Sequence, residues 1–214
     1  GKSLDVAKVQ GRLMAIPTLV SPMDIVPLIW MRTDWLENLN MSGPESMDDL
    51  LEIIEAFAQN DPDGNEKNDT VGLGVGKNLY EDGGTWVASL QGFFAGYHAY
   101  PTMWIKDEQG KLVYGGVQQE VKSALKKLQE LYQKGYLDEE FGVKDDGKIA
   151  EDVAKGKIGL EMGVDWHPFW PLNLAKQNNP DAEWKPFPLV SVDNEPVLAP
   201  TGINPDSMWF YCVN

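Results

Sequence analysis

The sequence predicts a single α/β domain in which a mixed β-sheet is flanked by helices. Apolar segments typical of short strands alternate along the chain with segments of helical periodicity. The clearest helical pattern covers Gln119 to Lys134, with apolar residues on one face, lysines on the other and Gly135 as a stop signal. No internal repeat or low-complexity linker divides the 214 residues, a length that can bury a sizeable core.

In the first half of the chain, short apolar strands are predicted at residues 13–16, stopped by Pro17, and at 24–31, broken by Pro27. Thr33 is expected to cap a short helix that ends near Leu36. Ser46 then opens an amphipathic helix in which apolar side chains recur at helical spacing and acidic residues fill the first turn. Residues 71–76, rich in glycine, read as a strand rather than a phosphate-binding loop, because the Lys-Ser/Thr of a nucleotide site is missing.

The second half continues the alternation. An aromatic-rich helix is predicted from 85 to 95, and a hairpin from 102 to 114 that turns at Asp107-Glu108-Gln109-Gly110. After the helix from 119 to 134, short helical pieces are expected at 138–141 and 149–154, a strand at 157–164, a helix at 171–178, and late strands at 184–190 and 197–198. Trp30 and Trp35 are predicted to be core residues.

Composition limits the partners. Acidic residues outnumber basic ones by 33 to 18, giving a net charge of −15, which argues against nucleic acid and against a polybasic membrane contact. No run of about 18 apolar residues predicts a membrane span. The chain opens without the basic segment and apolar core of a signal peptide, so we expect that an upstream part has been removed.

Cys212 is the only cysteine and cannot form an internal disulfide. It lies in the apolar run 208–213, which predicts a thiol buried in a strand rather than a reactive nucleophile. A protein that avoids cysteine is compatible with an oxidising or extracellular setting, although one thiol does not decide the compartment.

A polar loop at 61–69 has the spacing of a calcium-binding loop. Asp61, Asp63, Asn65 and Asp69 offer side-chain oxygens, and Lys67 offers its backbone carbonyl. Converging carboxylates repel one another unless a hard cation lies between them, and Ca²⁺ is the simplest such cation. The sequence therefore predicts a structural Ca²⁺, with no open coordination position beside a nucleophile.

The loop departs from the EF-hand pattern at two positions. Glycine stands at the fourth position instead of the sixth, and the twelfth is Gly72 where a bidentate Glu is expected. The alternative interpretation is a solvated turn, because Asp, Asn, Gly and Pro are common turn residues.

The segments around this loop, taken in their order, resemble the family 1 extracellular solute-binding proteins, the substrate-capture components of bacterial ABC importers, and especially the lipoprotein members that serve oligosaccharides. The segments that carry the resemblance are the run 28–36 with its Arg-Thr-Asp-Trp-Leu, Ser42-Gly43-Pro44-Glu45-Ser46, Ala56-Phe57, the polar loop, Asp69-Thr70-Val71-Gly72-Leu73, the entry-like 11–18 and 156–160. They are spread from residue 11 to residue 160, so the resemblance extends over most of the chain.

The resemblance implies a lobe of the type II periplasmic-binding-protein fold. In that family two α/β lobes are joined by crossing segments, and the second lobe is an insertion whose ends lie side by side. On this basis residues 1–214 are expected to be mainly the second lobe, with crossing segments near 11–20 and 197–204.

The resemblance also implies partners and a location. The expected ligand is a carbohydrate, most simply an oligosaccharide, held when two lobes close about a hinge. The expected protein partner is the membrane permease of an ABC importer, and the protein is expected to be a monomer. The full-length protein is expected to be extracellular and lipid-anchored to the outer face of the cell membrane, or periplasmic.

The candidate ligand site is the segment 163–171, which follows a predicted strand and gathers Asp165, Trp166, His167 and Trp170. Flat aromatic rings stack on the C–H faces of sugars, and the resemblance implies that Trp166 faces the cleft. Trp86, after a Gly-Gly-Thr sequence, is a second candidate and Ser21 a third. The alternative for each is packing beneath a long loop. Trp104, in the predicted hairpin, is open to either interpretation.

Two other classes of function were weighed. A carbohydrate-active enzyme is disfavoured because the chain has only His98 and His167 and no serine in a nucleophile-elbow motif. A stand-alone carbohydrate-binding module is disfavoured by the helix at 119–134, since such modules are usually β-sandwiches. We therefore expect a non-catalytic binding protein.

Overall fold

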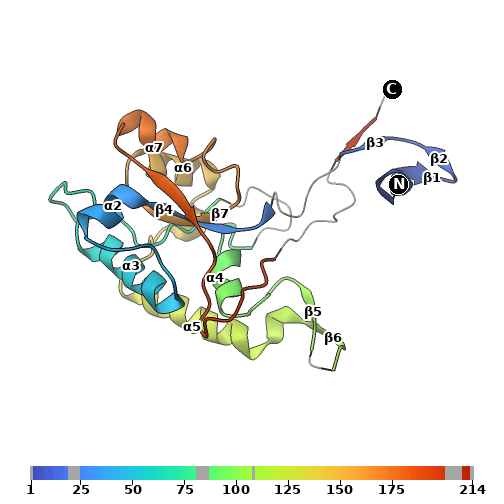
Figure 1. Ribbon diagram of the computed structural model, residues 1–214, viewed down its shortest axis with the longest axis horizontal. Coiled ribbons are helices and arrows are strands. Elements are labelled where there is room, and N and C mark those ends of the chain that lie inside the picture. The colour runs from blue at the N-terminus through green and yellow to red at the C-terminus, as the bar shows by residue number, and fades with distance from the viewer. Residues whose placement is uncertain (1, 19–24, 81–86, 108, 201–208, 213–214) are drawn as a thin grey trace.

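The computed structural model describes residues 2–18, 25–80, 87–107, 109–200 and 209–212 (Figure 1). The strands are β1 (Lys8–Val9), β2 (Arg12–Leu13), β3 (Ile16–Pro17), β4 (Leu28–Arg32), β5 (Trp104–Lys106), β6 (Leu112–Tyr114), β7 (Leu160–Gly163), β8 (Trp184–Phe187) and β9 (Phe210–Tyr211). The helices are α1 (Lys2–Asp5), α2 (Thr33–Asn38), α3 (Met47–Gln59), α4 (Gln91–Gly96), α5 (Gln119–Gln133), α6 (Asp146–Ala154) and α7 (Asn173–Asn178), with 3-10 turns at Gly115–Val117 and Phe141–Val143.

The main sheet has the strand order β7-β4-β8, and both pairings are antiparallel. Isolated bridges between Val71 and Ile158 and between Leu73 and Leu137 add parallel pairing. In Figure 1, α3, α4 and α5 lie on one side of this sheet and α6 and α7 on the other. The predicted α/β fold with a mixed sheet flanked by helices is confirmed.

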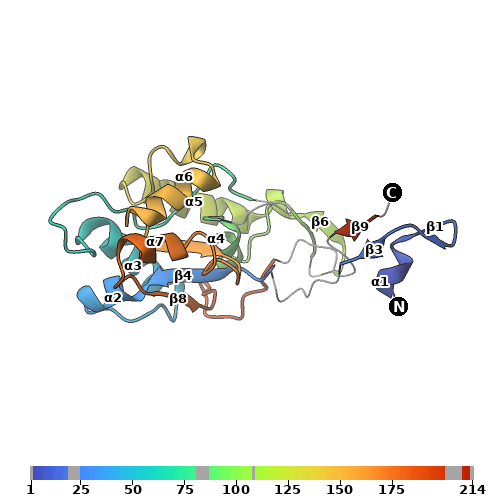
Figure 2. The ribbon, with the colours of Figure 1, turned by 90° about the horizontal axis from the view of Figure 1, so that it is seen from above.

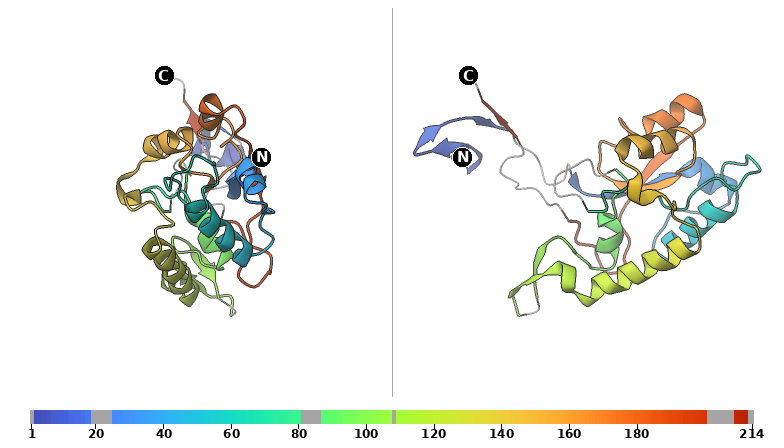
Figure 3. Two further views of the ribbon diagram at one scale, coloured as in Figure 1. Left: turned by 90° about the vertical axis from the view of Figure 1, so that its left-hand side faces the viewer. Right: turned by 180° about the vertical axis from the view of Figure 1, so that it is seen from behind.

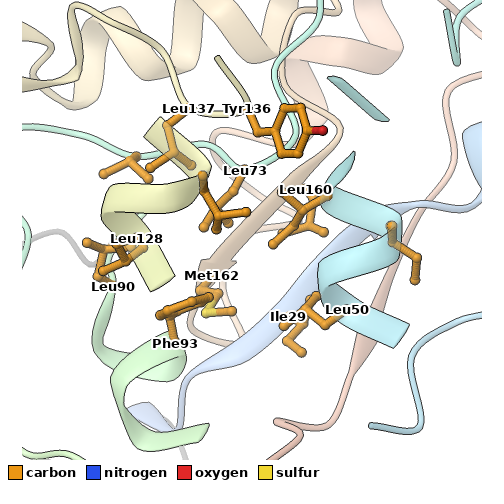
Figure 4. Packing of buried hydrophobic residues seen from close by; sticks show 14 of the residues in the cluster. Ile29, Leu50, Leu73, Leu90, Phe93, Leu128, Tyr136, Leu137, Leu160 and Met162 are labelled. Carbon is orange, nitrogen blue, oxygen red and sulfur yellow. The ribbon is translucent and has the colours of Figure 1, made fainter. Parts of the chain in front are cut away.

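The core follows from the alternation of side chains along β4. Ile29 and Met31 point into the larger apolar cluster, which α3, α4 and α5 complete (Figure 4). Trp30 points the opposite way, into a smaller cluster with α6 and α7. Trp35 is fully buried with its ring edge against Phe57, at a centroid distance of 5.2 Å. The prediction that Trp30 and Trp35 are core residues is confirmed.

The longer helices begin and end close to the predicted positions. Ser46 caps α3 in a capping box: its hydroxyl accepts from the Asp49 N–H, and the Asp49 carboxylate accepts from the Ser46 N–H. Helix α5 ends before Gly135, whose φ of +76° is the left-handed conformation that terminates helices. The predicted hairpin is also present, as β5 and β6.

Several predicted details are wrong. Thr33 is the first residue of α2 rather than its cap; Arg32 precedes the helix and pairs with Asp34. Residues 71–76 form isolated bridges instead of a strand, because Gly72 and Gly74 bring the backbone against neighbouring elements where a continuous ladder does not fit. Helix α4 begins only at Gln91, and residues 197–198 are not in a strand.

The two ends of the chain meet away from the main body. Strands β3 and β9 pair antiparallel, with Ile16 opposite Tyr211, and the three directions of view in Figures 1, 2 and 3 all show this ladder beside the β1–β2 hairpin and apart from the sheet. Apolar side chains here are exposed, including Leu13, Ile16, Trp209, Phe210 and Tyr211. Cys212 is exposed as well, so its predicted burial is wrong: β9 packs against no apolar layer among the described residues.

Strand β3 lies within the expected crossing segment 11–20, but β9 lies beyond the expected segment 197–204, and residues 19–20 and 201–204 are outside the described residues. The assignment of the chain to a second lobe stays a prediction. Within the part of the chain that the structure describes, no helix combines the length and apolar character that crossing a bilayer requires.

Candidate functional site

The segment 164–172 leaves the end of β7 and folds into successive turns. The N–H of His167 donates to the Val164 carbonyl at 3.2 Å, that of Phe169 to Trp166 at 2.9 Å, and that of Leu172 to His167 at 3.1 Å. The indole N–H of Trp30, from the middle of the sheet, donates to the Val164 carbonyl at 3.1 Å. This segment, which we call the aromatic loop, is therefore tied both to itself and to the sheet.

Two tryptophans of the aromatic loop stack on each other. The rings of Trp166 and Trp170 are nearly parallel, at an angle of 13° and a centroid distance of 6.4 Å. Both are half-buried, because one side packs against the smaller apolar cluster. Asp165 is exposed, and Phe169 is 80% exposed. The loop thus presents aromatic surface and a carboxylate to solvent, as a sugar site requires.

Phe169 is a functional candidate that the sequence reasoning did not single out. An aromatic side chain so exposed on a turn can stack on a ligand without giving up packing contacts within the protein. The available signal was its position between Pro168 and Trp170 in a loop that follows a strand.

His167 is placed differently from the other candidates. Its side chain is fully buried, and its Nδ1 lies 2.6 Å from Oε1 of Glu161, which is also fully buried. The other oxygen of Glu161 accepts from the N–H of Ala88 at 2.8 Å. A group with no exposed surface does not contact a ligand directly, so its placement argues against His167 as a contact residue. Glu161 was missed because a carboxylate in the apolar strand pattern carries no periodic signal.

Trp86 and Ser21, the other two candidates, lie outside the described residues. Trp104 is 68% exposed on β5 and lies beside Tyr114 of β6, with ring centroids 5.7 Å apart. The stacked pair and the hairpin pair are on separate elements, and neither lines either of two apolar-walled hollows found among the described residues. One of these, about 350 Å³, lies between α7 and β8; the other, about 390 Å³, lies between α5 and residues 75–80.

The loop at 61–69, the acidic loop, is organised by its own carboxylates. Both oxygens of Asp61 accept from backbone N–H groups, from Asn65 at 3.0 Å and from Glu66 at 2.9 Å. The side-chain amide of Asn65 donates to Asp63 at 2.8 Å and to Asp69 at 3.1 Å. Asp61, Asp63 and Asp69 therefore all bond to Asn65, Asp61 through the backbone N–H and the other two through the side-chain amide.

The contacts among these side chains affect the pKa of Asp63. Partial burial, the carboxyl group of Asp61, and the negative charges of Asp69 and Asp61 raise the pKa of Asp63, against the lowering effect of its bond from the Asn65 N–H. Carboxylates in this arrangement are stabilised by a positive ion. In the described residues, however, no group of three or more acidic, His or Cys side chains is already arranged around a metal position. The donor set fits Ca²⁺ in type and order, and the arrangement shown is one held by the Asn65 amide.

The two departures from the EF-hand pattern have structural counterparts. Glu66, at the sixth position, has a φ of +63°, the left-handed conformation for which EF-hands use glycine. Gly72, at the twelfth, lies so close to the Ile54 backbone of α3 that a Cβ would collide with its carbonyl oxygen. The backbone thus keeps the calcium-loop conformation at position six, while α3 leaves no room for a side chain at position twelve.

Comparison with known proteins identifies the fold. A solved extracellular solute-binding protein from Bifidobacterium longum subsp. infantis superposes with a TM-score of 0.66 at 19% identity, over 85% of this chain and 37% of that one. The substrate-binding protein FusA of a Streptococcus pneumoniae ABC transporter, in complex with kestose, gives 0.67 at 19% identity, over 92% and 42%. The fold is therefore that of the extracellular solute-binding proteins.

Sequence relatives agree. The chain is 37% identical over 130 residues to lipoprotein LipO of Bacillus subtilis, and 33% identical over 135 residues to the polygalacturonan/rhamnogalacturonan-binding protein YtcQ of the same organism. The matches span 61% and 63% of this chain but only about a quarter of each relative, 25% and 26%. No protein-family model matches. The resemblance to the extracellular solute-binding proteins is confirmed by these relatives and by the fold.

Two further solved structures share the fold. Alginate-binding protein AlgQ2, crystallised without calcium ion, superposes with a TM-score of 0.64 at 16% identity, over 86% of this chain and 36% of that one. An EF-hand mutant of FusA in complex with fructo-nystose gives 0.64 at 20% identity, over 84% and 35%.

Proposed function

We propose that the chain is one lobe of the substrate-binding component of an ABC importer and that it captures a carbohydrate, most simply an oligosaccharide. The observation that carries the proposal is the aromatic loop, where the stacked Trp166 and Trp170 and the exposed Phe169 offer flat surface beside the carboxylate of Asp165. Aromatic faces with a polar rim are the surface that sugars need. The solute-binding fold and the carbohydrate-binding relative support the same class of ligand.

Function is non-covalent in this proposal. A sugar stacked on the aromatic loop leaves its second face free for the other lobe, so closure is favoured because the ligand contacts both lobes at once. Trp86 and Ser21 remain proposed contacts. The permease of the importer is the partner, the protein is a monomer, and the site is extracellular or periplasmic with a lipid anchor on the full-length protein. A hydrolase is disfavoured because the described histidines are committed elsewhere: His167 to buried Glu161 and His98 to Asp193 at 3.0 Å.

Ca²⁺ is proposed as a structural ion of the acidic loop, held by Asp61, Asp63, Asn65, Asp69 and the carbonyl of Lys67. The raised pKa of Asp63 supports this, because partial burial and the neighbouring carboxyl groups of Asp61 and Asp69 disfavour its charged form, which a divalent cation would stabilise. The ion would draw the side chains together and brace the C-terminal end of α3, where negative charge is otherwise unfavourable.

The ligand proposal is tested by isothermal titration calorimetry on the full-length protein with kestose, stachyose and polygalacturonan fragments. For the sugar that binds, Trp166→Ala is expected to weaken the Kd about five- to tenfold, because one stacking contact is worth about 1–1.4 kcal/mol. Trp104→Ala is the matched control, an exposed tryptophan on a different element that should leave the Kd unchanged. Equal losses for both variants, or release of cleaved sugar, would contradict the proposal.

A further inference from the structure

The buried pair Glu161–His167 joins three segments that are distant in the sequence. Glu161 projects from β7, its Oε1 lies 2.6 Å from Nδ1 of His167 in the aromatic loop, and its Oε2 accepts from the N–H of Ala88 at 2.8 Å. Both side chains are 0% exposed. A buried carboxylate is costly unless its lone pairs are satisfied, and here each oxygen has one partner.

The hydrogen bonds define where the proton of the imidazole lies. At 2.6 Å a proton must lie between Nδ1 and Oε1, and Nε2 of His167, although buried, has no hydrogen-bond partner among the described residues. A buried N–H at Nε2 without an acceptor would be less favourable than a bare nitrogen. The arrangement therefore corresponds to a His167 that donates through Nδ1 to a carboxylate, with Nε2 unprotonated.

The packing around the pair leaves little freedom. A Cβ on Gly163 would collide with the imidazole ring, so the ring packs directly against the last residue of β7. Ala88, which donates to the other oxygen, has a φ of +51° and is fully buried; a non-glycine residue in this conformation persists only where surrounding contacts hold it. The carboxylate of Glu161 thus holds both the strained backbone of Ala88 and the packed ring of His167.

The ring in turn supports the stacked tryptophans. The indole of Trp166 lies 4.8 Å from the imidazole of His167, centroid to centroid, and Trp166 stacks on Trp170. The backbone of His167 also binds both ends of the loop, donating to Val164 and accepting from Leu172. A shift of the imidazole would therefore move the surface that Trp166 presents.

We propose that Glu161 and His167 are positioning residues of the carbohydrate site: the buried carboxylate holds the imidazole, and the imidazole sets the orientation of the Trp166–Trp170 stack. The proposal rests on the proposed function for its consequence, the affinity for sugar, but its structural part is testable without a ligand. Neither residue touches the sugar. They act as a rigid support beneath the contact surface, which a binding site needs if its geometry is to be defined before the ligand arrives.

The test compares two substitutions at one position in the full-length protein labelled with 5-fluorotryptophan. His167→Leu keeps the volume but removes the donor to Glu161, whereas the side-chain amide of His167→Asn can donate from about the position of Nδ1. In ¹⁹F NMR spectra, assigned with Trp166→Phe and Trp170→Phe, we expect His167→Leu to shift the resonances of Trp166 and Trp170 and leave that of Trp35 in place. His167→Asn should restore the two resonances most of the way.

Two controls separate positioning from general destabilisation. Val121→Ala, in α5 of the larger cluster, should lower the melting temperature without moving the resonances of Trp166 and Trp170. In calorimetry with the sugar identified among kestose, stachyose and polygalacturonan fragments, His167→Leu should weaken the Kd about tenfold and His167→Asn about twofold. If none of these sugars binds, the proposed ligand class fails, and the NMR result alone decides the positioning role.

The unaltered protein offers a third measurement should His167→Leu fail to fold. Its ¹⁵N chemical shifts should show a protonated Nδ1 and an unprotonated Nε2 for His167. The opposite tautomer, or a ring that is averaged between the two, would overturn the proposal, as would unchanged Trp166 and Trp170 resonances in His167→Leu or equal shifts in Val121→Ala.

Discussion

The acidic loop and the aromatic loop show two ways of holding a loop in place. The acidic loop is organised mainly by side chains within it: Asp61, Asp63 and Asn65 bond residues two to five positions along the chain, at the surface. The aromatic loop is held from outside, by a fully buried carboxylate on β7 that also binds Ala88, 73 residues away. The first depends on local spacing, the second on the completed core.

This difference has an energetic meaning. Exposed hydrogen bonds and charges compete with water, so each contributes little by itself and an ion can change the balance. A buried hydrogen-bonded carboxylate contributes mainly through what happens when it is removed, because its buried donors are left unsatisfied. We therefore expect the acidic loop to respond to calcium and pH, and the aromatic loop to respond to substitution in the core beneath it.

The largest effect is expected for Glu161→Ala, which leaves His167 and the N–H of Ala88 buried without their acceptor. It should lower the free energy of unfolding by about 2–6 kcal/mol, measured by urea denaturation, because each of the two buried donors left unsatisfied costs about 1–3 kcal/mol. A loss below about 1 kcal/mol would contradict the proposed difference between the two loops, since the aromatic loop would then be held by its own turns, as the acidic loop is. Glu139→Ala, an exposed acidic residue, is the control and should cost less than about 0.5 kcal/mol.

The second effect concerns calcium. At a Ca²⁺ concentration one hundred times its Kd, binding should stabilise the protein by about 2.7 kcal/mol, and chelation should remove that gain. Differential scanning calorimetry with Ca²⁺ and with EDTA measures it. Asp61→Asn should abolish most of the response, whereas Asp107→Asn, in the hairpin turn, should keep it. If neither Ca²⁺ nor EDTA changes the melting temperature, the acidic loop is a hydrogen-bonded turn and not a calcium site.

A smaller gain in stability is expected for Glu66→Gly. Glycine adopts the left-handed conformation of residue 66 without the cost of about 1–2 kcal/mol that other residues incur, but it loses about 0.5–1 kcal/mol through the flexibility of the unfolded chain. The net gain should be about 0.5–1 kcal/mol in chemical denaturation. Glu140→Gly, at a residue with φ of −96°, is the control and should be destabilising. A loss for Glu66→Gly as well would show that its side chain has a separate role.

The smallest effect is a pH dependence. Because the pKa of Asp63 is raised in the folded protein above 3.8, its unfavourable contribution is fully present above the folded pKa and disappears as the pH falls through that value towards 3.8. In EDTA at pH 7, Asp63→Asn should therefore stabilise the protein by up to about 0.5 kcal/mol, and the advantage should vanish in acid.

Asp193 provides the opposite case in the same titration. Hydrogen bonds from His98 and from the Glu195 N–H lower its pKa to about 2, so its contribution is present above 3.8 and lost as the pH falls from 3.8 towards 2. Urea midpoints of Asp193→Asn should lie below those of the unaltered protein at neutral pH and approach them in acid. If both variants changed in the same direction with pH, the assigned charge environments would be wrong.

What the sequence could predict follows the same division between local and distant causes. The helix start at Ser46, the stop at Gly135 and the oxygen spacing of the acidic loop all depend on neighbours within one or two turns, and all were visible in the sequence. The class of fold came from the order of such signals. Trp30 and Trp35 were predicted to be buried because both occur in apolar segments.

The rest could not be predicted because it depends on which elements meet. Nothing local distinguishes His167, which the core encloses, from Asp165, which it exposes. Glu161 occupies a position in β7 where apolar residues are expected. Its role as a hydrogen-bond acceptor can be recognised only once the fold places Ala88 and His167 beside it. Cys212 is the reverse case, since an apolar run predicts burial only if another layer covers it.

The close approach of Gly72 to the Ile54 carbonyl limits the affinity of the acidic loop for Ca²⁺. A loop that lacks the twelfth, bidentate ligand cannot acquire it by a single substitution, because any side chain there must first displace α3. If Ca²⁺ occupies the acidic loop, it is held by a partial coordination shell, which places the site nearer the millimolar sites of extracellular modules than the nanomolar sites of cytosolic buffers. Such a site is filled by the calcium of its surroundings and empties when that calcium is withdrawn.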